Sequence, residues 1–512
     1  MKFAKIQPKN KVYKSQRLSI FQRNFCFCTG IYKASLIISF TFLLSACHPH
    51  LLQNAILFSD SSGTIRRASK DNIYVTLSAL QHPHILQKYG GAYHDAKLER
   101  LLAQIVQKLA AVSQKKSRQR YFVTILNSES VNAFALPNGS IYITRGMLAL
   151  TNDCSEVAAI LAHEIAHITA NHGILRLQKQ AELKSAKHIP SHLLTHETNN
   201  LYNPIKEQKQ LAQFSRNQEL QADSIALEML KQAGYDPFAF PRFLQSMEAY
   251  SLFRHLSGAT SSSLDFLANH PTTPQRIRLA RKKAEKISIG YKGNTDRDSF
   301  LKTIDGMIFG GSSQTGFVRE NHFIQPKLRI TFSVPHNFTI ENSVHTVWAS
   351  GPEKIAIRFD TLPRPFEMTA SNYLKSGWIA GLDESSIQPV ILQGLSGAHG
   401  RATNEQWQFD VTVIMLNNHI LRFLTGAPHD SRNFAAITAQ TLQGFQLLSS
   451  SQLKKLKPLK IRVVQVKQGE SVANLANQMQ NTPHKEKLFR ILNALSPTQT
   501  LREGISVKII RE

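Results

Sequence analysis

The chain has 512 residues, of which 42% are hydrophobic, a length that predicts two to four domains. Its 61 Lys and Arg residues outnumber 35 Asp and Glu, giving a formal net charge of +26. A strongly basic protein favours anionic partners such as lipid head groups, cell-wall polymers or nucleic acids. No recognised nucleic-acid-binding motif is present, so we expect no nucleic-acid partner.

The N-terminal segment has the composition of an export signal. Residues 1–33 carry eight Lys or Arg and no acid, and the uncharged run ASLIISFTFLLSAC then ends at Cys47. A bilayer-spanning helix needs about 20 apolar residues, whereas a shorter run suits a signal peptide. LSAC is similar to a bacterial lipobox, so we expect a signal peptide over 1–46, a lipidated Cys47 and a tether over 47–80. An uncleaved anchor and a simple secretory signal are the alternatives.

This reading places the protein outside the cytoplasm. The signal accounts for eight positive charges, leaving about +18 on the rest of the chain. Beyond Cys47 only Cys154 remains, so no disulfide is expected within the mature chain. We expect a periplasmic protein, lipid-anchored to the outer or inner membrane of a Gram-negative bacterium.

The next predicted domain covers residues 81–288. DAKLERLLAQIVQKLA predicts a helix and YFVTIL a strand, and FALPNGSIYIT predicts two short strands about a Pro-Asn-Gly turn. Asp153, with Glu156 three residues later, predicts a capping box and a helix start near residue 154.

The helix that follows contains HEIAH, a pattern of zinc peptidases. His163 and His167 are four residues apart, so both imidazoles can reach one ion from the same helix face. Glu164 lies beside them and can take a proton from a water at the metal. The alternative is that both histidines are ordinary helix residues that match the pattern by chance.

A third ligand is needed to decide between these readings. Gly173 predicts that the helix ends there, and His172, five residues after His167, falls on another face. The helical stretch FSRNQELQADSIALEMLKQAGY instead places Glu219 and Asp223 four apart on a core-like surface. Two histidines and Glu219 with an open fourth position are typical of a catalytic zinc site.

These motifs together resemble a known family. HEIAH followed by ELQAD is similar to the gluzincin peptidases of the HtpX, CAAX-prenyl-protease, Oma and BepA group. NAFALPNGSIYITRGML (132–148) and HPTTPQR (270–276) resemble two further motifs of that group, in the same order. No further hydrophobic run reaches membrane-spanning length, which favours the soluble branch.

The resemblance implies a zinc metalloendopeptidase with one Zn²⁺ per chain, held by His163, His167 and Glu219. In this reading zinc lowers the pKa of water to about 7 and polarises the scissile carbonyl, and Glu164 is the general base. The edge strand at Asn132, Ala133, Phe134 and Ala135 would bind an extended substrate through main-chain hydrogen bonds.

Three residues have roles that stay open at this point. Asp223 either orients a ligand or pairs with Arg276, and the alternative is an exposed helix carboxylate. His270 precedes a proline, on a loop leading into a helix near Pro274. It either donates to the developing oxyanion, or occupies the open zinc position and keeps the enzyme latent, or is a surface histidine.

Two domains are predicted after the first. Alternating β-branched and aromatic segments in 289–452, with the helical SRNFAAITAQTLQGFQLLS, predict an antiparallel-sheet α+β domain of binding or scaffolding type. Residues 458–512 resemble a LysM module of β-α-α-β order, which implies either peptidoglycan binding or a degenerate interaction domain. The whole chain is therefore predicted to be multidomain α+β, with a mostly helical gluzincin domain carrying a small edge-strand sheet.

We expect the substrates to be unfolded or misassembled envelope proteins. The alternative from another functional class is a non-catalytic periplasmic chaperone or peptidoglycan-binding scaffold. A peptidoglycan-cleaving amidase is a weaker third reading.

Overall fold

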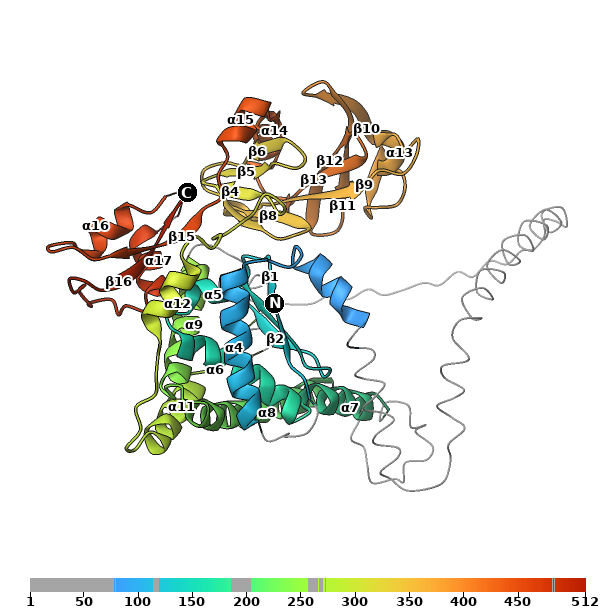
Figure 1. Ribbon diagram of the computed structural model, residues 1–512. Helices are drawn as coiled ribbons and strands as arrows, with labels where there is room; N and C mark the ends of the chain where they lie inside the picture. Colours follow the sequence, from blue (N-terminus) through green and yellow to red (C-terminus); the bar gives the residue numbers. More distant parts are fainter. Residues whose placement is uncertain are drawn as a thin grey trace, which may run out of the picture. The chain divides into compact units, whose positions relative to one another are not determined.

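The computed structural model describes residues 78, 80–113, 119–185, 204–256, 266, 270–271, 273–480, 482 and 484–512 (Figure 1). The chain divides into a unit over residues 1–73 and a unit over residues 74–512. The expected signal peptide, Cys47 and almost all of the expected tether lie outside the described residues. Within the described ranges, no helix combines the length and apolar character needed to cross a membrane.

The first part of the larger unit combines helices with one small sheet. The helices are α4 (Ala96–Val112), α5 (Arg145–Leu150), α6 (Cys154–Thr169), α7 (His172–Ser185), α8 (Pro204–Gln232), α9 (Ala239–Leu256), α11 (Pro274–Ile287) and α12 (Arg297–Ile304). The sheet has the order β1-β3-β2, with strands β1 (Phe122–Leu126), β2 (Ala133–Ala135) and β3 (Ser140–Thr144). The predicted strand pair about the Pro-Asn-Gly turn is confirmed, because β2 and β3 are antiparallel.

Helix α6 is the central element of this part. It packs against α4, α8 and α9, and nearly all of its side chains are buried. As predicted, Asp153 caps its start, and Asp153 Oδ1 accepts a hydrogen bond from Glu156 N at 2.8 Å. In a complete capping box the Glu156 side chain would also accept from the backbone N–H of Asp153. Glu156 Oε2 accepts instead from the backbone N–H of Asn152, one residue earlier. The expected capping box is therefore only half formed.

The predicted end of this helix at Gly173 is wrong. Helix α6 stops at Thr169, and Asn171 adopts a left-handed conformation with φ 56°. Asparagine tolerates this conformation better than most residues, so it can end a helix as glycine does. A new helix, α7, begins directly afterwards at His172. The side chain of His172 lies against His167, a contact that residues five apart in a continuous helix would not make.

The following part consists of two antiparallel sheets with short helices, as the sequence predicts. The seven-stranded sheet has the order β10-β11-β12-β13-β9-β8-β7, and the four-stranded sheet has the order β14-β6-β5-β4. The strands are β4 (Phe317–Arg319), β5 (His322–Gln325), β6 (Ile330–Ser333), β7 (Thr339–Asn342), β8 (Thr346–Ser350), β9 (Ala356–Pro363), β10 (Leu382–Leu392), β11 (Leu395–Thr403), β12 (Trp407–Leu416), β13 (His419–Pro428) and β14 (Gln446–Leu447). The helical segments are η4 (Pro352–Lys354), α13 (Ala370–Leu374), α14 (Phe434–Gln443) and α15 (Ser450–Lys455).

The C-terminal part has the predicted strand–helix–helix–strand order. Its elements are β15 (Lys460–Gln465), α16 (Val472–Asn477), α17 (Lys485–Leu492) and β16 (Ser506–Arg511), and the two strands pair antiparallel. Resemblance to a LysM module in function stays a prediction.

The C-terminal part shares one hydrophobic core with the first helices. A single cluster of buried residues runs from Leu98 in α4 to Ile510 in β16. Lys508 is fully buried, and its ammonium donates to Ala149 O at 2.8 Å and to Thr151 O at 2.7 Å. These carbonyls lie at the C-terminal end of α5, where a cation is favourable. The last strand therefore supports the corner that leads into α6.

Candidate metal centre

Two helices bring three of the predicted ligands together. His163 and His167 lie one turn apart on α6, and their Nε2 atoms are 3.0 Å apart. Glu219 comes from α8, with Oε2 at 3.4 Å from His163 Nε2 and Oε1 at 3.5 Å from His167 Nε2. His163 and Glu219 are buried, and the His167 side chain is 16% exposed. The chance-match alternative for the two histidines does not predict this convergence.

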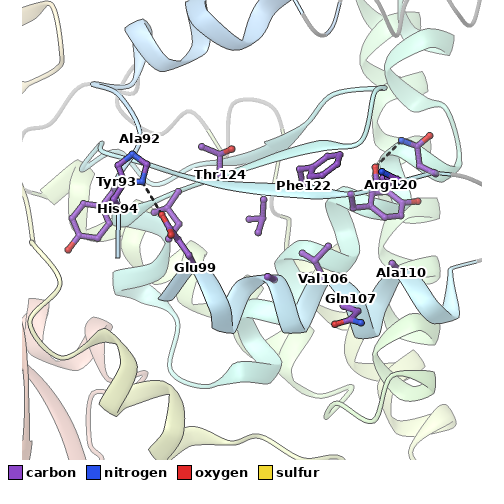
Figure 2. Close-up of a pocket in the computed structure, with 15 residues that line it drawn as sticks. Ala92, Tyr93, His94, Glu99, Val106, Gln107, Ala110, Arg120, Phe122 and Thr124 are labelled. Carbon is purple, nitrogen blue, oxygen red and sulfur yellow. Dashed lines mark hydrogen bonds and ion pairs between the residues drawn. The ribbon is translucent and has the colours of Figure 1, made fainter. Parts of the chain in front are cut away.

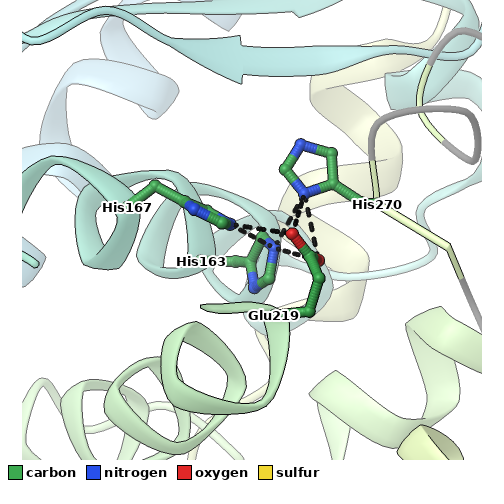
Figure 3. A group of neighbouring side chains, drawn as sticks. All are labelled: His163, His167, Glu219 and His270. Atoms are coloured by element: carbon green, nitrogen blue, oxygen red, sulfur yellow. Dashed lines mark hydrogen bonds and ion pairs between the residues drawn. The ribbon is translucent and has the colours of Figure 1, made fainter. Parts of the chain in front are cut away.

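His270 completes a group of four (Figure 3). Its Nδ1 lies 3.2 Å from His163 Nε2 and 3.1 Å from Glu219 Oε1. One ligand atom from each of the four residues lies within 4.8 Å of all the others. His270 is buried, and so the interpretation as a surface histidine is wrong.

The spacing of these atoms fits a tetrahedral ion. Ligand atoms at 2.0–2.1 Å from a tetrahedral zinc are about 3.3–3.4 Å from one another. The five contacts among the four residues given above range from 3.0 to 3.5 Å. Three imidazoles and a carboxylate are also the donor types that zinc prefers. The convergence of these residues and their donor types therefore fit such a metal.

Asp223 and Arg276 form a buried support behind the ligands. Arg276 donates to both oxygens of Asp223, from Nε to Oδ2 at 2.8 Å and from Nη2 to Oδ1 at 2.7 Å. Asp223 Oδ1 also lies 3.1 Å from His163 Nδ1, and Arg276 Nη1 lies 3.0 Å from Glu219 Oε2. The alternative of an exposed Asp223 is wrong. The pair is placed to orient one imidazole ligand and the carboxylate ligand.

The electrostatics of the group are those of a cation site. Burial opposes charge on His163, but the carboxylates of Asp223 and Glu219, which are acceptors with negative charge, outweigh it and raise the pKa of His163 to about 9. Burial raises the pKa of Glu219, yet His270 and His163 lower it well below its usual range. Burial, together with His163 and His270, lowers the pKa of His167. The anionic carboxylate among imidazoles favours a positive charge at the centre.

Glu164 lies next to this group without belonging to it. Its Oε1 is buried and has no hydrogen-bond partner among the described residues, and it lies 3.7 Å from His270 Nε2. Burial raises the pKa of Glu164, while a backbone hydrogen bond from Ala135 lowers it. A carboxylate with an unused acceptor beside a metal centre is suited to accept a proton from water.

The predicted substrate strand is placed beside Glu164. Strand β2 is an edge of its sheet, pairs only with β3 there, and contacts α6. Asn132, just before the strand, is buried and donates from Nδ2 to Tyr89 Oη at 2.9 Å. The Asn132 side chain therefore forms a hydrogen bond within the protein interior, whereas Ala133, Phe134 and Ala135 form the edge strand of the sheet.

A separate pocket of about 660 Å³ lies between α4 and β1 (Figure 2). Most of its lining is apolar, and the labelled ion pair in it joins His94 to Glu99 at 3.1 Å. It contains none of the four clustered residues. The metal-binding donor types lie instead in the group on α6 and α8.

The sequence analysis missed one neighbour of the group. His172 was excluded as a ligand by its spacing, and it is indeed not one of the four clustered residues. Its ring nevertheless lies against His167, with the two Nδ1 atoms 2.9 Å apart. The signal in the sequence was Asn171, whose tendency toward left-handed backbone allows the chain to turn before His172.

Comparison with known proteins supports the same chemistry. Residues 96–284 match Peptidase family M48. The chain is 27% identical over 184 residues to the beta-barrel assembly-enhancing protease of Yersinia pestis, covering 33% of this chain and 36% of that protein. It is 26% identical over 201 residues to the mitochondrial metalloendopeptidase OMA1 of Schizosaccharomyces pombe, covering 38% and 57%. For the OMA1 protein of Arabidopsis thaliana the identity is 31% over 157 residues, covering 31% and 30%.

The family match covers residues 96–284, and this chain spans less than two thirds of the length of each of these relatives. The matched residues contain all four members of the metal-binding group, together with Glu164, Asp223 and Arg276. Residues 96–284 are thus similar to Peptidase family M48, and the relatives that the chain matches are named as a protease or as metalloendopeptidases.

Proposed function

We propose that this protein is a zinc-dependent endopeptidase of the bacterial envelope. The observation that carries the proposal is the convergence of His163, His167 and Glu219 beside a Glu164 oxygen that accepts no hydrogen bond from the described residues. Two α6 imidazoles and an α8 carboxylate are the ligand set of a catalytic zinc site, in which the fourth position, taken here by His270, would pass to water or substrate. An edge strand next to the base suits an extended chain and needs no free terminus.

Each residue of the site has a separate role in the proposed hydrolysis. His163, His167 and Glu219 would hold the zinc ion, which would supply Lewis acidity toward water and the scissile carbonyl. Glu164 accepts the proton of the attacking water and passes it to the leaving amine. Asp223, held by Arg276, lies 3.1 Å from His163 Nδ1 and is placed to keep the imidazole with its Nε2 directed at the ligand group. Strand β2 aligns the substrate through its free backbone edge.

Zinc content provides the direct test. We expect one zinc per purified chain, loss of casein cleavage after chelation, and recovery when zinc is restored. Glu219→Ala removes a ligand and should lower bound zinc to near background. His94→Asn is the matched control, because His94 is exposed and pairs only with Glu99 on the surface. A chain that is free of zinc and takes none up would contradict the proposal.

His270 is proposed to act as a latch in the fourth position. Its Nδ1 lies among the ligand atoms, whereas an oxyanion donor has to lie where the substrate oxygen will be. We expect His270→Ala to raise casein cleavage about threefold or more, because the position becomes open to water and substrate. Initial rates at equal zinc occupancy measure this. A loss of about 10²-fold would instead assign the oxyanion role to His270.

Misfolded or misassembled envelope proteins are the proposed substrates. Two supports are available: the predicted export signal with Cys47, and relatives that are named beta-barrel assembly-enhancing proteases. A lipid anchor in the periplasm of a Gram-negative cell would place the protein beside such substrates. Peptidoglycan binding by the C-terminal part stays a prediction, whose support is its β-α-α-β order.

A further inference from the structure

The environment of His172 differs from that of every other histidine near the centre. His172 is the first residue of α7 and is buried. Its Nε2 lies 3.1 Å from Gln221 Oε1, and its Nδ1 lies 2.9 Å from His167 Nδ1. Its carbonyl accepts from Gln218 Nε2 at 3.0 Å. Both glutamines flank Glu219 on α8, so the helix that supplies the carboxylate ligand also holds His172.

The chain of contacts fixes where each proton lies. An amide oxygen can only accept, so His172 carries its proton on Nε2 and donates it to Gln221. The Nδ1 of a neutral imidazole in this form is an acceptor, so His167 must donate from its own Nδ1. The Nε2 of His167 is then left with a lone pair. That atom faces the group, 3.0 Å from His163 Nε2 and 3.5 Å from Glu219 Oε1.

We propose that His172 is a positioning residue, which together with Gln221 holds His167 in the orientation and tautomer that a zinc ligand requires. The inference rests on the zinc site of the proposed function. It gives the two α6 ligands different supports: His163 faces the carboxylate of Asp223, whereas His167 faces a neutral imidazole–amide pair. Partners of this kind orient a ligand and typically change metal affinity by about 10- to 100-fold when removed.

The left-handed turn makes this arrangement possible. In a continuous helix His172 would lie five residues beyond His167, on another face. With α6 ended at Thr169 and Asn171 at φ 56°, the ring of His172 instead packs edge-on against His167, with centroids 4.9 Å apart. The left-handed turn at Asn171, just after α6 ends, therefore also brings His172 against His167, the second ligand on that helix.

The test measures zinc affinity of the full chain by competition with a chelator. His172→Leu introduces an apolar side chain of similar bulk that has no acceptor for His167. We expect this variant to bind zinc about 10- to 100-fold more weakly. His172→Asn can place its amide oxygen where Nδ1 lies, and should rescue affinity to within about threefold of wild type. The cobalt-substituted variants give a second readout, because a displaced His167 changes the visible absorption bands of the ion.

Two further variants keep the result interpretable. Gln221 is exposed, so Gln221→Leu leaves packing intact while removing the acceptor that sets the tautomer of His172. It should weaken zinc binding even if His172→Leu does not fold. Gln213→Leu, on an exposed stretch of the same helix, is the matched control and should bind zinc normally.

The possible results either support or overturn the positioning role of His172. Unchanged zinc affinity in folded His172→Leu, or in Gln221→Leu where the former does not fold, overturns the inference. Equal weakening in His172→Leu and His172→Asn, with a lower thermal midpoint of the metal-free protein, also overturns it, because it indicates a purely structural role. If the wild-type chain itself binds no zinc, the proposed function fails instead.

Discussion

Replacing Glu164 by glutamine is expected to slow casein cleavage by about 10²- to 10⁴-fold while zinc stays bound. Glutamine has nearly the same shape as glutamate but cannot take a proton from water. The Oε1 atom of Glu164 is buried and accepts no hydrogen bond from the described residues, so little folding stability depends on its charge. Initial rates and zinc content of the same preparation measure both parts.

The control for this result is Glu99→Gln. Glu99 is a half-exposed carboxylate on α4 that pairs with His94, far from the ligand group in sequence and outside it in the structure. Its variant should cleave casein at the wild-type rate. If Glu164→Gln cleaves casein as fast as wild type while holding its zinc, the protein is better explained as a non-catalytic chaperone or scaffold.

Replacing Lys508 by methionine is expected to destabilise the folded chain by about 3 kcal/mol at pH 6. Burial lowers the pKa of Lys508 to about 7, so the ammonium is still charged at that pH. Methionine fills similar space but leaves the carbonyls of Ala149 and Thr151 without this donor. Urea unfolding, monitored by circular dichroism, measures the loss.

Lys487→Met provides the matched comparison in the same part of the chain. Lys487 is exposed on α17, and surface substitutions of this kind usually change stability by less than about 0.5 kcal/mol. The unfolding midpoint of this variant should stay at the wild-type value. A Lys508→Met chain that unfolds at the same urea concentration as wild type would show that β16 is not needed to support the α5–α6 corner.

Local signals in the sequence were sufficient for the elements that carry the ligands. Asp153 marked the start of α6, and the Pro-Asn-Gly turn marked the β2–β3 pair. The four-residue spacing of His163 and His167 gave the ligand face. Glu219 could be predicted because a carboxylate on a core-like helix surface needs a cation or a donor.

Other features depend on packing between distant segments, which local patterns do not encode. The motif at His270 left three roles open, because whether its ring reaches the ligands depends on how its loop lies against α6 and α8. A lysine such as Lys508 in a short strand predicts solvent exposure, and only the fold reveals its buried carbonyl partners. The contact of His172 with His167 could not be predicted, because one left-handed residue, Asn171, changes the direction of the chain before His172.

The single core from Leu98 to Ile510 has a consequence for how the protein is made. Ribosomes release a chain from its N-terminus, so α6 and its histidines emerge long before β16. The buried residues Val507, Ile509 and Ile510 must leave the ribosome before this core can close. A nascent chain therefore cannot finish packing the core around α6 until β16 has been translated and has emerged.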